Sequence, residues 1–244
     1  MRMHKRFKLF FSLALVVITL GASSCFDILE EYEFHADGSG KATVLVDVAK
    51  MMDMMEAFGS AMDSTGNEAG KSMDEMFTEN QTVAQLKAIP GISNVQDLNN
   101  RDTKQIGYSY EFKNIEALNQ ALVLRESSLG LGDAFGLGGD DESPETDREN
   151  SIAYAGKKFS RKMDMTMPAN DEEDEESKQY MQMAMMMFQD AKYTVKYSFD
   201  RNVKKVKGND AALIGADKKS VTIENTMKDL LEGKANMNVD LKLK

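Results

Sequence analysis

The sequence predicts an α+β protein in which antiparallel β-hairpins form a sheet packed on one side by methionine-rich helices. Apolar and polar side chains alternate in several short segments, which is typical of strands with one buried face. Other segments space their apolar residues three and four apart, as helices do. The chain has 244 residues, of which 42% are hydrophobic, so it is long enough to bury a core.

The predicted strands come in pairs along the chain. Residues 29–50 alternate on both sides of the turn Asp37-Gly38-Ser39-Gly40, which predicts an antiparallel hairpin. Further hairpins are predicted over 92–113 and over 151–167, the latter turning near Gly156. Single strands are predicted at 193–199, 218–223 and 237–243.

Predicted helices separate these strands. They cover residues 50–62, 82–89, 114–122, 180–190 and 226–232. Pro90 ends the second helix, Asn114 can cap the start of the third, and Gly233 follows the last. The helices over 50–62 and 180–190 contain most of the clustered methionines. Residues 126–150 change in composition and contain five glycines, which predicts a flexible Gly/acidic loop. The acidic segment 170–177 is expected to be solvated and to start a helix.

The first 24 residues have the three parts of a secretory signal peptide. Four basic residues without an acid precede an uncharged stretch of twelve at 9–20, and small residues follow at 21–24. Twelve helical residues span about 18 Å, less than the roughly 30 Å hydrocarbon core of a bilayer. We therefore expect a cleaved segment 1–24 and a mature domain 25–244.

Cys25, the single cysteine of the chain, stands directly after the small residues. This arrangement resembles the lipobox of bacterial lipoproteins, in which the cysteine is acylated, with palmitate or a similar chain, and becomes the new N-terminus. The resemblance implies an envelope protein anchored through acyl chains, with the periplasmic side and surface display both left open. By analogy with enterobacterial lipoproteins, Phe26 after the cysteine favours the outer membrane over the inner membrane. An ordinary cleaved signal, or an uncleaved anchor helix, remains open as an alternative.

Overall charge limits the partners. The chain carries 30 basic and 40 acidic side chains. Loss of the four basic residues of the leader leaves 26 cations against 40 anions, a net charge of −14. Such a polyanion is not expected to bind nucleic acid, and anionic headgroups are expected to repel it. Membrane attachment is thus predicted through acyl chains and not through a basic patch.

The sequence does not predict an enzyme, a catalytic residue, a metal or a cofactor. His4 belongs to the leader, and His35 lies on the polar face of the first hairpin. One remaining imidazole does not build a His-clustered metal site or a Ser-His-Asp triad.

Nineteen methionines are the one unusual chemical feature. Several recur at helical spacing, so they share helix faces. They are candidates for an apolar groove, together with one phenylalanine: Met181, Met183, Met185, Met187, Phe188, Met51, Met54 and Met55. Core packing is the simpler interpretation, because methionine fills irregular gaps. Cu(I) binding through soft thioethers is a remote alternative.

Two stretches resemble LppM-type bacterial lipoproteins. One is the DGSG turn soon after Cys25, and the other is the block 193–224 with its Val203–Asp210 connection. The resemblance implies an envelope domain of mixed α/β structure that handles lipid and has no established catalytic residues. We therefore expect a membrane-anchored lipoprotein with a non-catalytic role in binding a lipid or another apolar ligand. The alternative is a structural or assembly partner of another envelope protein.

Overall fold

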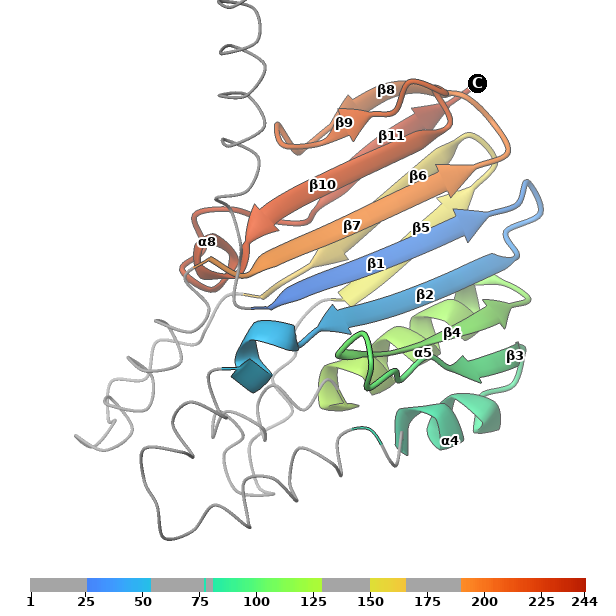
Figure 1. Cartoon of the computed structure of the whole chain (residues 1–244). Helices are drawn as coiled ribbons and strands as arrows, with labels where there is room; N and C mark the ends of the chain where they lie inside the picture. Colours follow the sequence, from blue (N-terminus) through green and yellow to red (C-terminus); the bar gives the residue numbers. More distant parts are fainter. Residues whose placement is uncertain (1–25, 54–76, 78–80, 129–149, 166–189) are drawn as a thin grey trace, which may run out of the picture.

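The computed structural model describes residues 26–53, 77, 81–128, 150–165 and 190–244 (Figure 1). These residues form two β-sheets with a few helices, which confirms the predicted α+β class. A seven-stranded sheet has the order β3-β4-β2-β1-β7-β10-β9, and a four-stranded sheet has the order β5-β6-β11-β8. The Met-rich helix predicted at 180–190 lies outside the described residues, as do the acidic segment 170–177 and nearly all of the loop 126–150.

The elements have the following bounds. The strands of the large sheet are β1 (Asp27–Phe34), β2 (Gly40–Asp47), β3 (Ile92–Asp97), β4 (Gln105–Phe112), β7 (Lys192–Phe199), β9 (Leu213–Ile214) and β10 (Ser220–Thr226). The strands of the small sheet are β5 (Asn150–Ala155), β6 (Lys158–Met163), β8 (Val203–Lys207) and β11 (Val239–Leu243). The labelled helices are α4 (Gln81–Ala88), α5 (Ile115–Ser128) and α8 (Met227–Leu231). Residues 49–53, at the start of the helix predicted over 50–62, are also helical, and the rest of that prediction lies outside the described residues.

The predicted hairpins are confirmed. β1 pairs with β2, β3 with β4 and β5 with β6, all antiparallel. In the first turn, Asp37 Oδ1 accepts hydrogen bonds from the Ser39 backbone N–H at 3.0 Å and the Ser39 hydroxyl at 2.7 Å. Gly38 takes a φ of 89°, which glycine adopts without strain. Local turn chemistry therefore fixes this hairpin.

The centre of the large sheet is a parallel pair, β1 beside β7. Asp27 is paired with Lys192 and Phe34 with Phe199, so strands about 165 residues apart run side by side. The other strand pairs of both sheets are antiparallel. The small strands β8 and β9 were not among the predicted strands.

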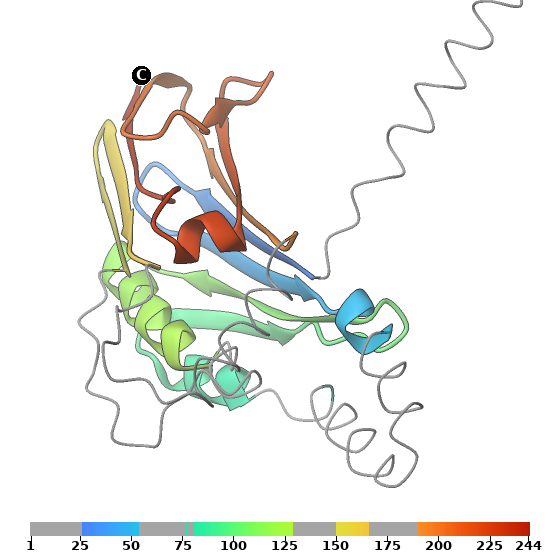
Figure 2. The same cartoon turned by 90° about the vertical axis from the view of Figure 1, so that its left-hand side faces the viewer.

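The core lies between the two sheets, which face each other (Figures 1 and 2). Phe34 of β1 is 5.2 Å from Phe159 of β6 and 5.5 Å from Phe199 of β7, measured between ring centroids. Phe159 is also 4.9 Å from Tyr197 of β7. These aromatic contacts join the sheets, because each ring buries a large apolar area at the interface.

The helices α4 and α5 cover the β3–β4 end of the large sheet, and α8 lies at one end of the molecule (Figures 1 and 2). Asn114 caps α5 as predicted, since its Oδ1 accepts from Ala117 N at 2.9 Å. Thr226 caps α8 by accepting from Asp229 N at 3.1 Å. Among the described residues, the structure contains no helix that is long and apolar enough to span a membrane.

Candidate functional site

Two opposite charges are buried between the sheets. Glu30 on β1 and Arg161 on β6 have fully buried side chains, and Arg161 Nη2 lies 4.0 Å from Glu30 Oε2. Charged groups are rarely removed from water unless they are paired and hydrogen-bonded. The pair is therefore a feature that the fold must hold in a fixed geometry.

Tyrosine hydroxyls and a thioether surround this pair. Tyr32 donates a hydrogen bond of 2.7 Å to Glu30 Oε2, and the Tyr193 hydroxyl donates to Glu30 Oε1. Arg161 Nη2 also lies 3.6 Å from Met163 Sδ, and its guanidinium lies 5.8 Å from the centroid of the Tyr32 ring. Three strands thus supply a polar cluster inside an otherwise aromatic core. We call Glu30, Tyr32, Arg161, Met163 and Tyr193 the buried cluster.

The buried cluster was not predicted from the sequence. Glu30 points to the same face of β1 as Tyr32 and Phe34. Arg161 points to the same face of β6 as Phe159 and Met163. The available signal was a charged residue at one of the alternating strand positions that otherwise carry apolar residues, because every second side chain of a strand points to the same face. The sequence does not show that the two charges meet.

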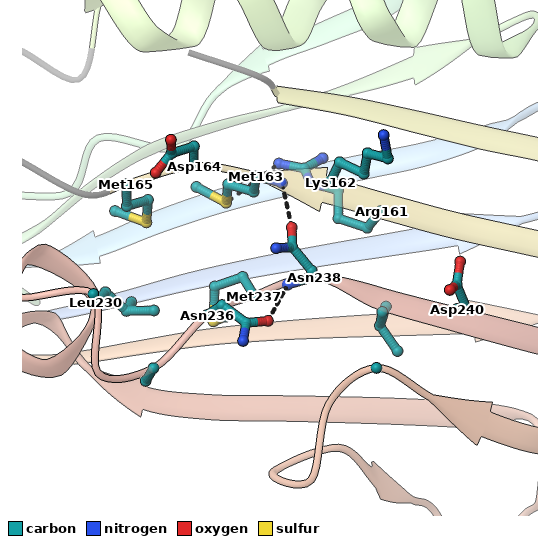
Figure 3. Close-up of a pocket in the computed structure, with 14 residues that line it drawn as sticks. Arg161, Lys162, Met163, Asp164, Met165, Leu230, Asn236, Met237, Asn238 and Asp240 are labelled. Atoms are coloured by element: carbon teal, nitrogen blue, oxygen red, sulfur yellow. Dashed lines mark hydrogen bonds between the residues drawn. The ribbon is translucent and has the colours of Figure 1, made fainter.

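A pocket of about 680 Å³ opens beside the buried cluster (Figure 3). Its walls come from the end of β6, from α8 and the residues after it, and from the segment leading into β11. Arg161 and three methionines, Met163, Met165 and Met237, are among its lining residues, with Leu230 of α8. The lining therefore mixes these apolar side chains with polar and charged ones, among them Lys162, Asp164 and Asn236.

Asparagines hold one wall of the pocket in place. Asn238 Oδ1 accepts from Met163 N at 2.7 Å, and Asn236 Oδ1 accepts from Asn238 N at 3.0 Å (Figure 3). Asn209 Nδ2 donates to the carbonyls of Asn236 at 2.9 Å and Asn238 at 3.0 Å. Asn225 Nδ2 adds a bond of 3.1 Å to the Asn236 carbonyl. Side-chain amides thereby satisfy backbone groups of this wall, of which Met163 N is partly buried.

The predicted site residues are only partly within the described chain. Met51 is 5% exposed and belongs to the hydrophobic core. The lipidation site Cys25 and the other proposed groove residues lie outside the described residues: Met54, Met55, Met181, Met183, Met185, Met187 and Phe188. The predicted groove and the predicted acylation thus stay predictions.

The described residues contain no group of three His, Cys, Asp or Glu side chains that converge as a metal site. His35 is exposed, as its predicted position on the polar face of the first hairpin requires, and its Nδ1 lies 3.5 Å from Asp200 Oδ2. What the described geometry provides is a pocket next to a buried charge pair.

Fold and pocket together define a two-sheet α+β domain with a pocket between the small sheet and α8. No protein-family model matches the chain, and no curated protein matches its sequence. A solved structure that it is similar to is the NMR structure of the folded domain of LppM from Mycobacterium tuberculosis. The two chains are 10% identical, the TM-score is 0.40, and the alignment covers 91% of this chain and 90% of that chain.

Proposed function

We propose that the protein is an envelope lipoprotein, anchored through Cys25, whose folded domain binds a lipid or another apolar ligand without catalysing a reaction. The anchor is supported by the leader, with its basic start, its short uncharged stretch and its cysteine after small residues. The binding role is supported by the pocket beside the buried cluster.

The pocket is the observation that carries the binding role. Its volume of about 680 Å³ lies within the range of roughly 300–1,000 Å³ that small-molecule sites occupy. Thioether side chains are flexible and polarisable, so the partly buried Met165 can adapt to an alkyl chain, while Met163 and Met237 belong to the buried core beside it. Lys162, which is exposed and also lines the pocket, offers an ammonium group to a polar or acidic headgroup, whereas the Arg161 side chain is fully buried beside Glu30. An amphipathic molecule fits both parts of this lining.

The assembly alternative has less support in the described chain. Large apolar side chains exposed among the described residues are Val123 on α5 and Leu213 with Ile214 on β9. They belong to two separate elements, α5 and β9. A docking site for another protein more often shows a contiguous apolar patch.

A thermal-shift experiment tests the pocket. Palmitate and phosphatidylglycerol, each supplied below its aggregation limit, are added to the full chain in separate series. A ligand at 100 times its Kd stabilises the folded state by about 2.7 kcal/mol, which raises the Tm of a chain of this size by roughly 5–10 °C. No shift with either lipid, together with no lipid in the organic extract of the native protein, would contradict the proposal.

Met165→Glu is the informative variant, because Met165 is only partly buried and lines the pocket. The introduced carboxylate should abolish the Tm shift, since an acyl chain would have to desolvate it. Val123→Glu is the matched control: it adds the same charge at a side chain that is 64% exposed on α5. Equal loss of the shift in both variants would show that binding does not occur in this pocket.

The anchor has its own test. The intact mass of the native protein should correspond to a chain that begins at Cys25 and carries acyl chains, and the protein should fractionate with membranes. Cys25→Ser should abolish acylation and release the protein from the membrane fraction. A native chain that retains Met1 and stays in the cytosol would overturn export, whatever the outcome for the pocket.

A further inference from the structure

The outer face of the small sheet carries a cluster of lysines. Lys158 of β6, Lys205 and Lys207 of β8 and Lys242 of β11 line one hollow of about 520 Å³ on that face. The single acid among the lining residues is Asp240, so the local net charge is +3. We call these four lysines the lysine face. None of the four lysines lines the pocket considered above, and the two linings share only Asp240.

Strand register explains why the lysines meet. Lys242 is paired directly with Lys158 on one side and with Lys205 on the other, so three ammonium groups form one row across β6, β11 and β8. Neighbouring strands are about 4.8 Å apart. Like charges placed directly opposite each other on a sheet destabilise it. The row therefore gains stability when anions approach the face.

The outer face of the large sheet is organised differently. There, Lys196 Nζ lies 2.9 Å from Glu31 Oε1, and Lys192 Nζ lies 3.0 Å from Glu224 Oε1. Cations on that face are matched by carboxylates of neighbouring strands. For the lysine face, the described part of the chain gives no carboxylate within 4 Å of any of the four ammonium groups. Positive charge is thus concentrated on one side of a chain whose net charge is −10.

We propose that the lysine face docks on the anionic headgroups of a phospholipid bilayer. The face belongs to a sheet and presents its charges side by side, which suits an extended array of phosphates. Lysine is a compact charge on a flexible stem, so it can reach several headgroups without the fixed fork geometry of arginine. Overall charge predicted repulsion from such a surface, but contact with a bilayer depends on the charge within a Debye length of it, roughly 10 Å at 0.1 M salt.

Protection of lysines from a water-soluble acetylating reagent tests the docking. The full chain is mixed with, or reconstituted into, vesicles of phosphatidylcholine alone or with 30 mol% phosphatidylglycerol (a composition chosen for roughly physiological charge density). Acetylation of each lysine is then measured by peptide mass spectrometry. On the anionic vesicles, the four lysines should react at least about fivefold more slowly, the effect that one lysine near a charged surface contributes. High salt should remove the protection.

Four exposed lysines outside the face serve as internal controls: Lys41, Lys87, Lys113 and Lys219. Their acetylation should be the same on both kinds of vesicle. Equal protection of both groups, or no protection of either, would overturn the proposal. Protection by short-chain inorganic polyphosphate without protection by the anionic vesicles would also overturn it and would assign the face to a soluble polyanion.

Substitution separates the arrangement of charge from its amount. The variant with Lys158→Gln, Lys205→Gln, Lys207→Gln and Lys242→Gln should lose the protection of Lys157, an exposed lysine directly before Lys158 that does not line the first pocket. The control variant changes Lys41, Lys87, Lys113 and Lys219 to Gln and loses the same net charge. Retained protection of Lys157 in the control supports the proposal, and equal loss in both variants contradicts it.

Discussion

Glu30 and Arg161 face each other from different sheets, with 4.0 Å between Glu30 Oε2 and Arg161 Nη2 and no exposure of either side chain. The carboxylate is held by the hydroxyls of Tyr32 and Tyr193. A buried ion pair costs desolvation free energy that its attraction repays only in a well-bonded geometry. The stability of the two-sheet arrangement therefore depends on keeping both partners.

The first prediction concerns this pair. Arg161→Met should lower the free energy of unfolding by about 3–5 kcal/mol, because it leaves the Glu30 charge buried without its counter-ion. The double variant Arg161→Met with Glu30→Leu should recover part of that loss. Urea unfolding measures both. The control Glu31→Gln, which breaks the exposed pair with Lys196, should cost less than about 1 kcal/mol. Additive losses in the double variant would show that the two charges do not interact.

The second prediction concerns Asn119, which joins α5 to the edge of the small sheet. Its Oδ1 accepts from Ile152 N at 2.9 Å, and its Nδ2 donates to Ile152 O at 3.0 Å, so the amide takes the place of a neighbouring strand. Asn119→Leu should destabilise the protein by about 1–3 kcal/mol, since it leaves both backbone groups of Ile152 unsatisfied. The exposed neighbour Gln120→Leu should change stability by less than about 0.5 kcal/mol. Equal effects of the two changes would contradict this role.

The third prediction concerns Gly40, the first residue of β2. A Cβ at this position would lie 1.9 Å from the Glu33 carbonyl oxygen and 2.6 Å from Phe112 Cζ. Gly40→Ala should therefore displace the first hairpin and cost more than about 3 kcal/mol, measured by chemical unfolding. Gly156→Asn is the comparison, because nothing lies within 4 Å of a Cβ there and asparagine tolerates the φ of 61°. A stable, unchanged Gly40→Ala protein would refute the close approach.

The fourth prediction concerns pH. The backbone N–H of Lys219 donates to Asp217 Oδ1 at 2.9 Å, and the hydroxyl and N–H of Ser220 donate at 2.9 and 3.1 Å. These bonds, with that from Lys219 first, hold the pKa of Asp217 below its ordinary value of 3.8. Because the folded pKa is the lower one, the stabilisation is complete above pH 3.8 and is lost as the pH falls through the folded pKa.

Asp217→Asn should accordingly flatten the fall in stability on acidification below pH 3.8, followed as the urea midpoint against pH. Asp210→Asn removes the same charge from the same connection between β8 and β10 and serves as the control. If stability fell below pH 3.8 as steeply in Asp217→Asn as in the unchanged protein, these hydrogen bonds would not persist in solution.

The sequence by itself determined the local elements. Alternation around Asp37-Gly38 and around Gly156 predicted hairpins that the structure contains, and Asn114 and Thr226 cap helices near the predicted positions. These features depend on residues close together in the chain: turn chemistry fixes the register of a hairpin, and a side chain two or three residues away satisfies a helix end.

Only the tertiary structure decided which strands become neighbours. The period of two shows which side chains share a face, but it does not name the partner strand. The parallel pairing of β1 with β7, the meeting of Glu30 with Arg161 and the row Lys158–Lys242–Lys205 all join residues far apart in the chain. They depend on which strands pair within each sheet and on how the two sheets pack, and local sequence spacing encodes neither. The candidate pocket and the lysine face are products of that packing.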